Sequence, residues 1–504
     1  IFDKNIILRS SSFNEDTDEF TNAGLYKSYV IKKINSQEIK SKIDKIIKDF
    51  ENSKDEIIAQ EFLENVDLAG VAFSRDPNIN APYYIINYDT SGHTNKITSG
   101  VKNLSSATSV IYKDKKIKNK FEQLIDQIKL FENILQKNAL DVEFAKKNNK
   151  WFIFQCRPLP IKKNFFLDNS VQKTLTNIEK KIQKLKVKNP NLSGKSTFFS
   201  NMSDWNPAEM LGTKPKPLAI SLYAELITNS IWSKQRSNYG YKDVSPNPLM
   251  YNIAGSPFID LRTDLNSFLP KNISYNQSEQ IINSCLNKIK KNWKLHDKIE
   301  FNVIPTCFDF NIRDKFKISS STYQSKLKSL TKDILYDGEK ILNKELNNIK
   351  LLNKKISKIT NSKLSFIQKI FLYSNDCKNF GTLPFAGIAR ISFICTQILN
   401  SLVEKKKITK EQNSEIFQSF NTITKSINND YLKSKINFKE KKNFLKKYGH
   451  LRPSTYSISS LNFEEGYDLY FSKNRKKIKK NKLPAKLLKD RQLSNYFKKN
   501  DINI

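Results

Sequence analysis

The first 160 residues alternate short apolar runs with amphipathic stretches. Runs of strand length, each bounded by turn residues, occur at 6–9, 57–63, 70–74, 83–88, 139–145 and 150–157. Apolar residues recur at helical spacing over 39–50 and again over about 117–136. The stripe of the first helix that we expect to pack on the strands consists of Ile43, Ile46, Ile47 and Phe50. This alternation predicts an α+β domain over residues 1–160, with an antiparallel-rich sheet.

The pattern changes after residue 160. Residues 161–195 are rich in Lys and Asn, and their sparse apolar positions predict a linker that contains one largely solvated helix. Long helical patterns then follow at 217–235, 277–296, 322–356, 362–374, 386–405, 409–427 and 437–448. They predict a mostly α-helical domain over 196–480, followed by a basic, weakly periodic tail over 481–504.

The chain carries a formal net charge of +36, which on its own would suggest a nucleic-acid partner. The Lys residues are, however, spread along helix faces, without an alternation of Arg and aromatic residues. Lys, Asn and Ile are abundant throughout, which indicates a compositional bias rather than a nucleic-acid site. An anionic substrate such as ATP fits the same charge, so we expect ATP rather than nucleic acid.

The cysteines and the hydropathy of the chain indicate in which cellular compartment the protein is expected. The five cysteines show no CxxC spacing and have no His partners at the spacing of zinc ligands. This predicts reduced thiols in a cytoplasmic protein, with neither a disulfide nor a structural metal. No apolar run reaches the length that spans a bilayer, and the N-terminus has no signal-peptide pattern, so no membrane partner is expected.

Two short polar motifs flank a Lys/Asn turn. They are Asp141-Val142-Glu143 and Gln155-Cys156-Arg157. Residues two apart on a strand point the same way, so each motif presents two polar side chains on one face. If the turn has an odd number of residues, all four lie on one face, and Phe144, Phe152 and Phe154 pack into the core. Two carboxylates, an amide oxygen and a guanidinium would then suit Mg²⁺ and a polyphosphate, although an ordinary hairpin with one solvated face is the alternative.

Further motifs accompany this pair. In chain order they are Leu8-Arg9-Ser10-Ser11-Ser12, Glu15-Asp16, Ala23-Gly24, Ser28-Tyr29, Ala59-Gln60-Glu61-Phe62, Gly70-Val71-Ala72-Phe73-Ser74-Arg75-Asp76-Pro77, Ser99-Gly100 and Phe154-Gln155-Cys156-Arg157-Pro158. Together they resemble the ATP-grasp nucleotide-binding domain of the phosphoenolpyruvate synthase and pyruvate phosphate dikinase family. The resemblance implies an ATP-grasp-like fold for residues 1–160, with ATP and Mg²⁺ as ligands.

The resemblance also implies a role for each matching residue. Arg9 would contact the β- and γ-phosphates, and Arg157 would contact a phosphate. Glu143 and Gln155 would bind Mg²⁺, with Asp141 beside them. The adenine edge would be held by backbone groups of Gln60, Glu61, Phe62 and Leu63. The phosphate loop would be lined by Ser10, Ser11 and Ser28.

The chain departs from the family pattern in two ways. Leu25 and Lys27 stand where the family tends to have polar or acidic residues. The family's first ATP-grasp subdomain, with its phosphate-binding Lys, would lie upstream of Ile1. We therefore expect this chain to be part of a longer protein.

Beyond residue 196 the motif order resembles rifampicin phosphotransferase and glutamine kinase-like enzymes, in which a helical acceptor-binding domain follows the ATP-grasp domain. The matching pieces are Asn201-Met202-Ser203-Asp204-Trp205-Asn206-Pro207-Ala208-Glu209, Pro215-Lys216-Pro217-Leu218 and Tyr448-Gly449-His450-Leu451-Arg452-Pro453. Candidates for acceptor contacts are Asp204, Glu209, Arg390, His450 and Arg452. A structural ion pair, a helix cap or a surface position is the alternative for each of them.

The family's carrier histidine lies in a glycine-rich GGxxxH-type context, which none of His93, His296 and His450 has. A swivelling His domain is therefore expected beyond Ile504. The predicted function is an ATP-dependent dikinase-type phosphotransferase that acts on a small-molecule acceptor through this carrier and releases AMP and phosphate. The alternatives are a phosphoenolpyruvate synthase that acts on pyruvate and a non-catalytic ATP-binding regulatory module.

Overall fold

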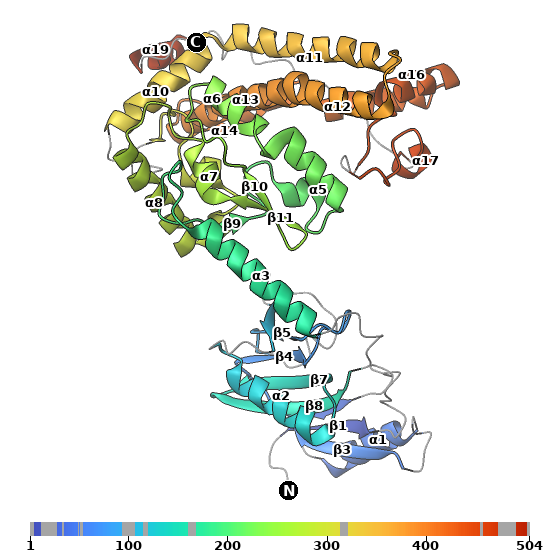
Figure 1. Ribbon diagram of the computed structural model, residues 1–504. Coiled ribbons are helices and arrows are strands. Elements are labelled where there is room, and N and C mark those ends of the chain that lie inside the picture. The colour runs from blue at the N-terminus through green and yellow to red at the C-terminus, as the bar shows by residue number, and fades with distance from the viewer. Residues whose placement is uncertain are drawn as a thin grey trace. The chain divides into compact units, whose positions relative to one another are not determined.

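In the computed structural model the chain forms two compact units, Ile1–Glu179 and Lys180–Ile504 (Figure 1). The structure describes residues 5–11, 28–32, 35–48, 50, 54–92, 106–113, 119–159, 168–312, 321–453, 457–471 and 490–500. The boundary between the units falls within α3 (Asp168–Lys186), a helix of mostly exposed residues inside the segment expected to be a linker. The expected fold class is confirmed, because antiparallel sheets with helices come first and a mostly helical region follows.

Unit 1 contains a three-stranded antiparallel sheet of order β2-β1-β3. Its strands are β1 (Ile6–Ser11), β2 (Tyr29–Ile31) and β3 (Glu56–Glu61). Helix α1 (Ser36–Ile47) buries Ile46 on this sheet, with Ile43 and Phe50 packed beside it. Ile47, predicted on the same stripe, is 50% exposed. The prediction was wrong there because adjacent helical residues point about 100° apart, and the sheet contacts the side of Ile46.

Unit 1 also contains a five-stranded antiparallel sheet of order β6-β5-β4-β7-β8. Its strands are β4 (Leu68–Phe73), β5 (Tyr83–Asp89), β6 (Ser106–Tyr112), β7 (Leu140–Lys147) and β8 (Lys150–Pro158). Helix α2 (Glu122–Leu135) lies across β7 and β8 and buries Leu124, Ile125 and Ile128 on one face of the sheet (Figure 1). A Cβ at Gly70 would stand 2.0 Å from the carbonyl oxygen of Asn87, so glycine allows β4 and β5 to approach closely.

The β7–β8 hairpin combines a two-residue turn with a bulge. Asn148 and Asn149 have φ angles of 49° and 61°, as a type I′ turn requires. With this even turn alone, Glu143 would pair with Phe154, and Gln155 would point to the opposite face. The register instead shifts next to Glu143, which pairs with Gln155. The turn is therefore not odd, and the extra residue of the bulge brings the polar side chains onto one face.

The bulge also decides which aromatic side chains reach the core. Phe144 packs beneath α2, as predicted. The prediction was wrong for Phe152 and Phe154, which lie on the opposite face. Trp151 and Ile153 pack against the α2 core in their place.

Unit 2 begins with a small sheet of order β10-β11-β9, which the hydrophobic pattern did not predict. Its strands are β9 (Phe199–Ser200), β10 (Met250–Ile253) and β11 (Ser256–Asp260). The helices are α4 (Pro207–Leu211), α5 (Pro217–Tyr223), α6 (Ile231–Asn238), α7 (Leu261–Asn266), α8 (Tyr275–Lys291), α10 (Ser321–Tyr336), α11 (Gly338–Thr360), α12 (Phe366–Cys377), α13 (Leu383–Glu404), α14 (Lys410–Ser419), α15 (Ile423–Ser434), α16 (Phe438–Tyr448), α17 (Tyr467–Tyr470) and α19 (Arg491–Lys499). The patterns at 217–235, 322–356 and 409–427, each expected to be one helix, are each divided into two helices.

Short π-helical segments interrupt or connect several of these helices. They are η1 (Ala224–Thr228), η3 (Ile299–Val303) and η4 (Lys378–Thr382), and a 3₁₀ turn η2 covers Trp293–Leu295. Such segments change the direction in which neighbouring side chains point. Most of the buried charges described below come from η3, from α6, which follows η1, and from α13, which follows η4. The core of the unit is built around large buried side chains such as Tyr223, Trp232, Phe268 and Tyr323.

Helices α12 and α13 join through η4 into one apolar stretch, Phe366–Glu404, which is long and apolar enough to cross a membrane by length and composition. The prediction that no run reaches that length was therefore wrong. Helix α13 buries Arg390 and Gln397 inside unit 2, which is the environment of a core helix.

Candidate functional site

The polar motifs of β7 and β8 form one continuous surface in unit 1. Asp141 lies directly opposite Arg157 in the ladder, and Glu143 lies opposite Gln155. Opposed residues in an antiparallel pair have Cβ atoms about 4.5–5.5 Å apart, so the four side chains are neighbours. Arg157 donates from Nε and Nη2 to Oδ2 of Asp141, at 3.0 and 2.9 Å. The predicted sharing of one face is thus confirmed.

Strand β1 brings a second arginine to this surface. Nη1 of Arg9 lies 3.4 Å from Oε2 of Glu143, and the guanidinium stands 5.9 Å from the ring centre of Phe154. On β3, Nε2 of Gln60 donates to the carbonyl oxygen of Phe154 at 3.5 Å. The two sheets of unit 1 therefore meet at β8, and residues separated by more than a hundred positions gather at their junction.

Two polar atoms at this junction have no hydrogen-bond partner among the described residues. They are Nε of Arg9 and Oε1 of Gln60, and both are buried. Buried polar atoms in native proteins are nearly always paired, so such atoms mark a place for a ligand or water. The neighbouring thiol is not reactive: burial, and then the carboxylate of Asp141, raises the pKa of Cys156 to about 11.

The serines expected to line a phosphate loop do not all lie on the face of Arg9. Ser11 follows the alternation of β1 and shares the face of Arg9. Ser10 pairs with Ile57 and points to the side packed by α1, away from Glu143. Ser28 is exposed and directly precedes β2. Most of the polar loop, residues 12–27, lies outside the described residues, as do His93, Ser99 and Gly100.

Part of the segment expected to hold the adenine already makes hydrogen bonds and apolar contacts within unit 1. Gln60 and Glu61 end β3, and the N–H of Phe62 donates to the carbonyl oxygen of Asn5 at 2.7 Å. Leu63 packs with Val66, Ala69 and Ala145 in a small apolar cluster. An adenine contact through the amide of Phe62 would have to replace the bond to Asn5, so other backbone groups of this segment are better placed for that role.

The five acceptor candidates of unit 2 have different surroundings. Asp204 and Arg390 belong to a buried polar network. Glu209 is exposed in the first turn of α4, where it accepts a hydrogen bond from Nδ2 of Asn206 at 2.6 Å. His450 is exposed after α16, and Arg452 donates to the carbonyl oxygen of Ser460. Glu209 and Arg452 make local helix-start and loop contacts, and no contact found among the described residues joins Glu209, His450 or Arg452 to Asp204 or Arg390.

Arg390 is fixed by one carboxylate and its neighbours. Its guanidinium makes two contacts with Glu300, with Nη2 lying 3.1 Å from Oε2. Gln397 donates to Oε1 of Glu300 at 3.3 Å and to Oγ1 of Thr306 at 2.9 Å. The side chains of Arg390 and Glu300 are almost wholly buried. Because an unpaired charge in the core is strongly destabilising, each of the two stabilises the charge of the other.

A second buried arginine, Arg236, lies against the same Phe268 ring. Nη2 of Arg236 lies 2.5 Å from Oδ2 of Asp204, and Nη1 lies 3.5 Å from Oδ1 of Asp264. The guanidinium carbons of Arg236 and Arg390 stand 3.9 and 5.1 Å from the centre of the Phe268 ring. Sequence reasoning missed Arg236, Asp264 and Glu300, because only their burial distinguishes them from ordinary charged helix residues.

The loop that delivers Asp204 is strained. Trp205 and Asn206 have φ angles of 58° and 31°, in the left-handed region that bulky residues avoid. The hydroxyl of Tyr223 donates to the carbonyl oxygen of Trp205 at 2.5 Å and holds this conformation. Strain of this kind persists where surrounding contacts impose it, often at functional sites.

Asp264 provides a pH-dependent prediction. Burial raises the pKa of Asp264 well above its ordinary value, Asp204 raises it further, and Arg236 opposes both. The native state then holds a proton that the unfolded state has lost, so stability falls as pH rises above about 3.9, by up to about 1.4 kcal/mol per pH unit. Asp264→Asn, which imitates the protonated acid, should flatten this fall and exceed the parent in stability at alkaline pH. Denaturant titrations across the pH range check this, with exposed Asp297→Asn as control. An unchanged pH profile would contradict it.

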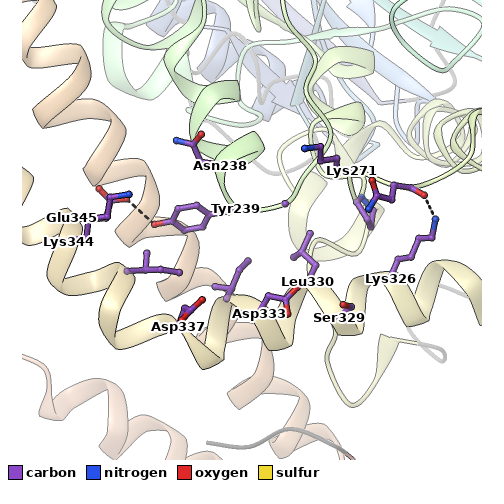
Figure 2. Close-up of a pocket in the computed structure, with 15 residues that line it drawn as sticks. Asn238, Tyr239, Lys271, Lys326, Ser329, Leu330, Asp333, Asp337, Lys344 and Glu345 are labelled. Atoms are coloured by element: carbon purple, nitrogen blue, oxygen red, sulfur yellow. Dashed lines mark hydrogen bonds between the residues drawn. The ribbon is translucent and has the colours of Figure 1, made fainter.

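Unit 2 also contains a polar cavity of about 650 Å³ (Figure 2). Tyr239 projects into it toward Glu345, with Asp333 and Asp337 on the opposite wall and Lys271 above (Figure 2). None of the five acceptor candidates lines this cavity.

The described residues contain no group of three or more His, Cys, Asp or Glu side chains that could hold a metal ion. A fully protein-ligated centre is thus not found in that part of the chain. The pair of Glu143 and the amide oxygen of Gln155 does fit Mg²⁺ in a nucleotide complex, because Mg²⁺ there takes one or two protein oxygens together with phosphate oxygens.

No family model matches this chain, and no curated protein matches it significantly. The arrangement of its own side chains therefore carries any functional proposal.

Proposed function

We propose that this chain binds Mg·ATP in unit 1 as part of an ATP-dependent, dikinase-type phosphotransferase. The observation that carries the proposal is the gathering of Arg9, Asp141, Glu143, Gln155 and Arg157 where the two sheets of unit 1 meet. Oxygen ligands beside two guanidiniums are what a magnesium-bound polyphosphate requires. The unpaired buried atoms of Arg9 and Gln60 support a ligand at this position.

Each side chain has a part in this proposal. Glu143 and Gln155 would hold Mg²⁺, which would neutralise phosphate charge. Arg9, now 3.4 Å from Glu143, would exchange that carboxylate for a phosphate oxygen. Asp141 orients the guanidinium of Arg157 toward the same surface. Asp141 is thus a positioning residue, whereas Arg9 and Arg157 would touch the nucleotide.

The acceptor in this proposal is a small amide or hydroxyl compound in unit 2, reached through a phosphohistidine carrier. Dividing the transfer into two steps lets one carrier serve two separate sites. Asp204 and Arg390 remain the acceptor candidates among the original five, because both join the charged network around Phe268. The polar cavity beside Tyr239 is a second place where such a compound would find hydrogen-bond partners.

Calorimetric titration with ATP, in the presence of Mg²⁺ and of a chelator, tests the nucleotide site. We expect ATP binding that depends on Mg²⁺, and no binding when AMP replaces ATP. Release of AMP is then measured with pyruvate, glutamine and hydroxylated compounds in parallel. Turnover with pyruvate would favour the phosphoenolpyruvate synthase alternative, and ATP binding without AMP release with any acceptor would favour the regulatory module. Absence of any ATP binding would contradict the proposal.

A further inference from the structure

The hairpin of α11 and α12 carries a group of exposed apolar side chains. We call this group the α11–α12 tip, and its members are Leu364, Phe366, Ile367, Ile370 and Phe371. The last four are 85%, 81%, 64% and 73% exposed. Residues at these spacings fall on one side of a helix, so they form a contiguous apolar surface. Monomeric soluble proteins rarely expose such a surface unless something binds it.

The hairpin beneath the tip is well ordered by its own contacts. Helices α11 and α12 pack side by side (Figure 1). Oγ1 of Thr360 and the hydroxyl of Tyr373 are 2.8 Å apart, and Nζ of Lys369 donates to the carbonyl oxygen of Thr360 at 3.0 Å. Ser365 and Gln368 form a capping box at the start of α12. The apolar side chains therefore project from a fixed scaffold that they do not themselves hold together.

The charge around the tip is of one sign. From Leu346 to Asn375 the sequence contains no Asp or Glu. The same stretch contains six lysines, Lys350, Lys354, Lys355, Lys358, Lys363 and Lys369. Lys355 pairs with Asp376 at 3.1 Å, and no ion pair is found for the other five among the described residues. The hairpin therefore combines an apolar tip with lysines and no acidic residue from Leu346 to Asn375.

We propose that the α11–α12 tip docks this protein onto an anionic membrane surface. Phe and Ile side chains on one side of a helix enter the boundary between headgroups and acyl chains, and neighbouring lysines pair with anionic headgroups. The net charge of +36 favours the same partner at longer range. A second copy of this chain fits less well, because it would bring the same lysines together.

Peripheral docking does not require a membrane-spanning segment. The apolar stretch Phe366–Glu404 has its α13 part buried in unit 2, where Arg390 pairs with Glu300. The α12 part exposes Phe366, Ile367, Ile370 and Phe371, whereas α13 exposes Phe385 and Phe393 among its large apolar side chains. The expectation from sequence of no membrane partner rested on spanning length, which a surface contact does not need. The inference is independent of the ATP site.

Co-sedimentation with vesicles tests the proposal. We expect binding to vesicles of phosphatidylcholine and phosphatidylserine at least about tenfold stronger than to phosphatidylcholine alone, weakening as salt is raised. Ile370→Ser should weaken binding to the anionic vesicles several-fold, and Phe366→Ser with Phe371→Ser should weaken it further. Ile134→Ser in unit 1 is the matched control, because Ile134 and Ile370 are both 64% exposed. Melting temperatures of all variants are compared with the parent.

A second pair of variants separates charge from apolar contact. Lys358→Glu with Lys363→Glu should abolish the preference for anionic vesicles while leaving all apolar side chains in place. Three results would overturn the proposal: no vesicle binding by the parent, equal binding to neutral and anionic vesicles, or tip variants that bind as the parent does. Concentration-dependent dimerisation that Ile370→Ser abolishes would assign the tip to self-association instead.

Discussion

Glu143→Ala is expected to weaken Mg²⁺-dependent ATP binding by at least about tenfold. The substitution removes a charged oxygen ligand, and contacts to charged groups contribute about 1.5–3 kcal/mol, which corresponds to roughly 10- to 150-fold. Stability should change little, because the only ion pair found for Glu143 in the described residues is a partly exposed one with Arg9 at 3.4 Å. Calorimetric titration with Mg·ATP, together with a melting curve, measures both effects.

Two further variants test whether the effect is specific to the charged oxygen of Glu143. Glu143→Gln keeps the shape and an oxygen but removes the charge, so it should retain more ATP binding than alanine does and lose its Mg²⁺ dependence in part. Glu122→Ala, an exposed acid at the start of α2, is the matched control and should bind ATP as the parent does. If Glu143→Ala bound Mg·ATP with unchanged affinity, Glu143 would not be a magnesium ligand, and the polar surface of β7 and β8 would be an ordinary solvated hairpin face.

Arg390→Met is expected to destabilise unit 2 by about 3–5 kcal/mol. It leaves Glu300 as an uncompensated charge in the core, and the loss of one partner of a buried pair costs about this much. Denaturant unfolding followed by circular dichroism measures it. The transition of unit 2 should move to lower denaturant concentration, with its slope unchanged.

The double variant Arg390→Met with Glu300→Met should recover most of that loss. Buried pairs replaced by apolar residues of similar volume are often neutral in stability. Lys378→Met supplies the comparison, because Lys378 pairs with Glu225 at a partly exposed position. It should cost no more than about 1 kcal/mol. If the single and double variants at the buried pair were equally unstable, unpaired charge would not be the cause, and lost packing around Phe268 would account for the effect.

The hydrophobic pattern of the sequence predicted the positions of most strands and helices of unit 1. Strands β4, β5, β7 and β8 appear as apolar runs because each has a side buried in the sheet core. Strand β6 was missed, since it forms a sheet edge and begins Ser-Ala-Thr-Ser, which gives no apolar signal. In unit 2, strand β9 is two residues long, too short for any pattern to register.

The sequence by itself determined the α+β character of unit 1, the helical character of unit 2, and the pairing of D-x-E with Q-x-R as a candidate site. These features depend on spacing between near neighbours, which alternation and helical period report directly. Only the tertiary structure decided that a bulge aligns Glu143 with Gln155, because its extra residue is invisible in the pattern. It also brought Arg9 to Glu143 and paired Arg236 with Asp204. Such contacts join residues far apart in sequence, and burial, which no local pattern encodes, fixes which charges must pair.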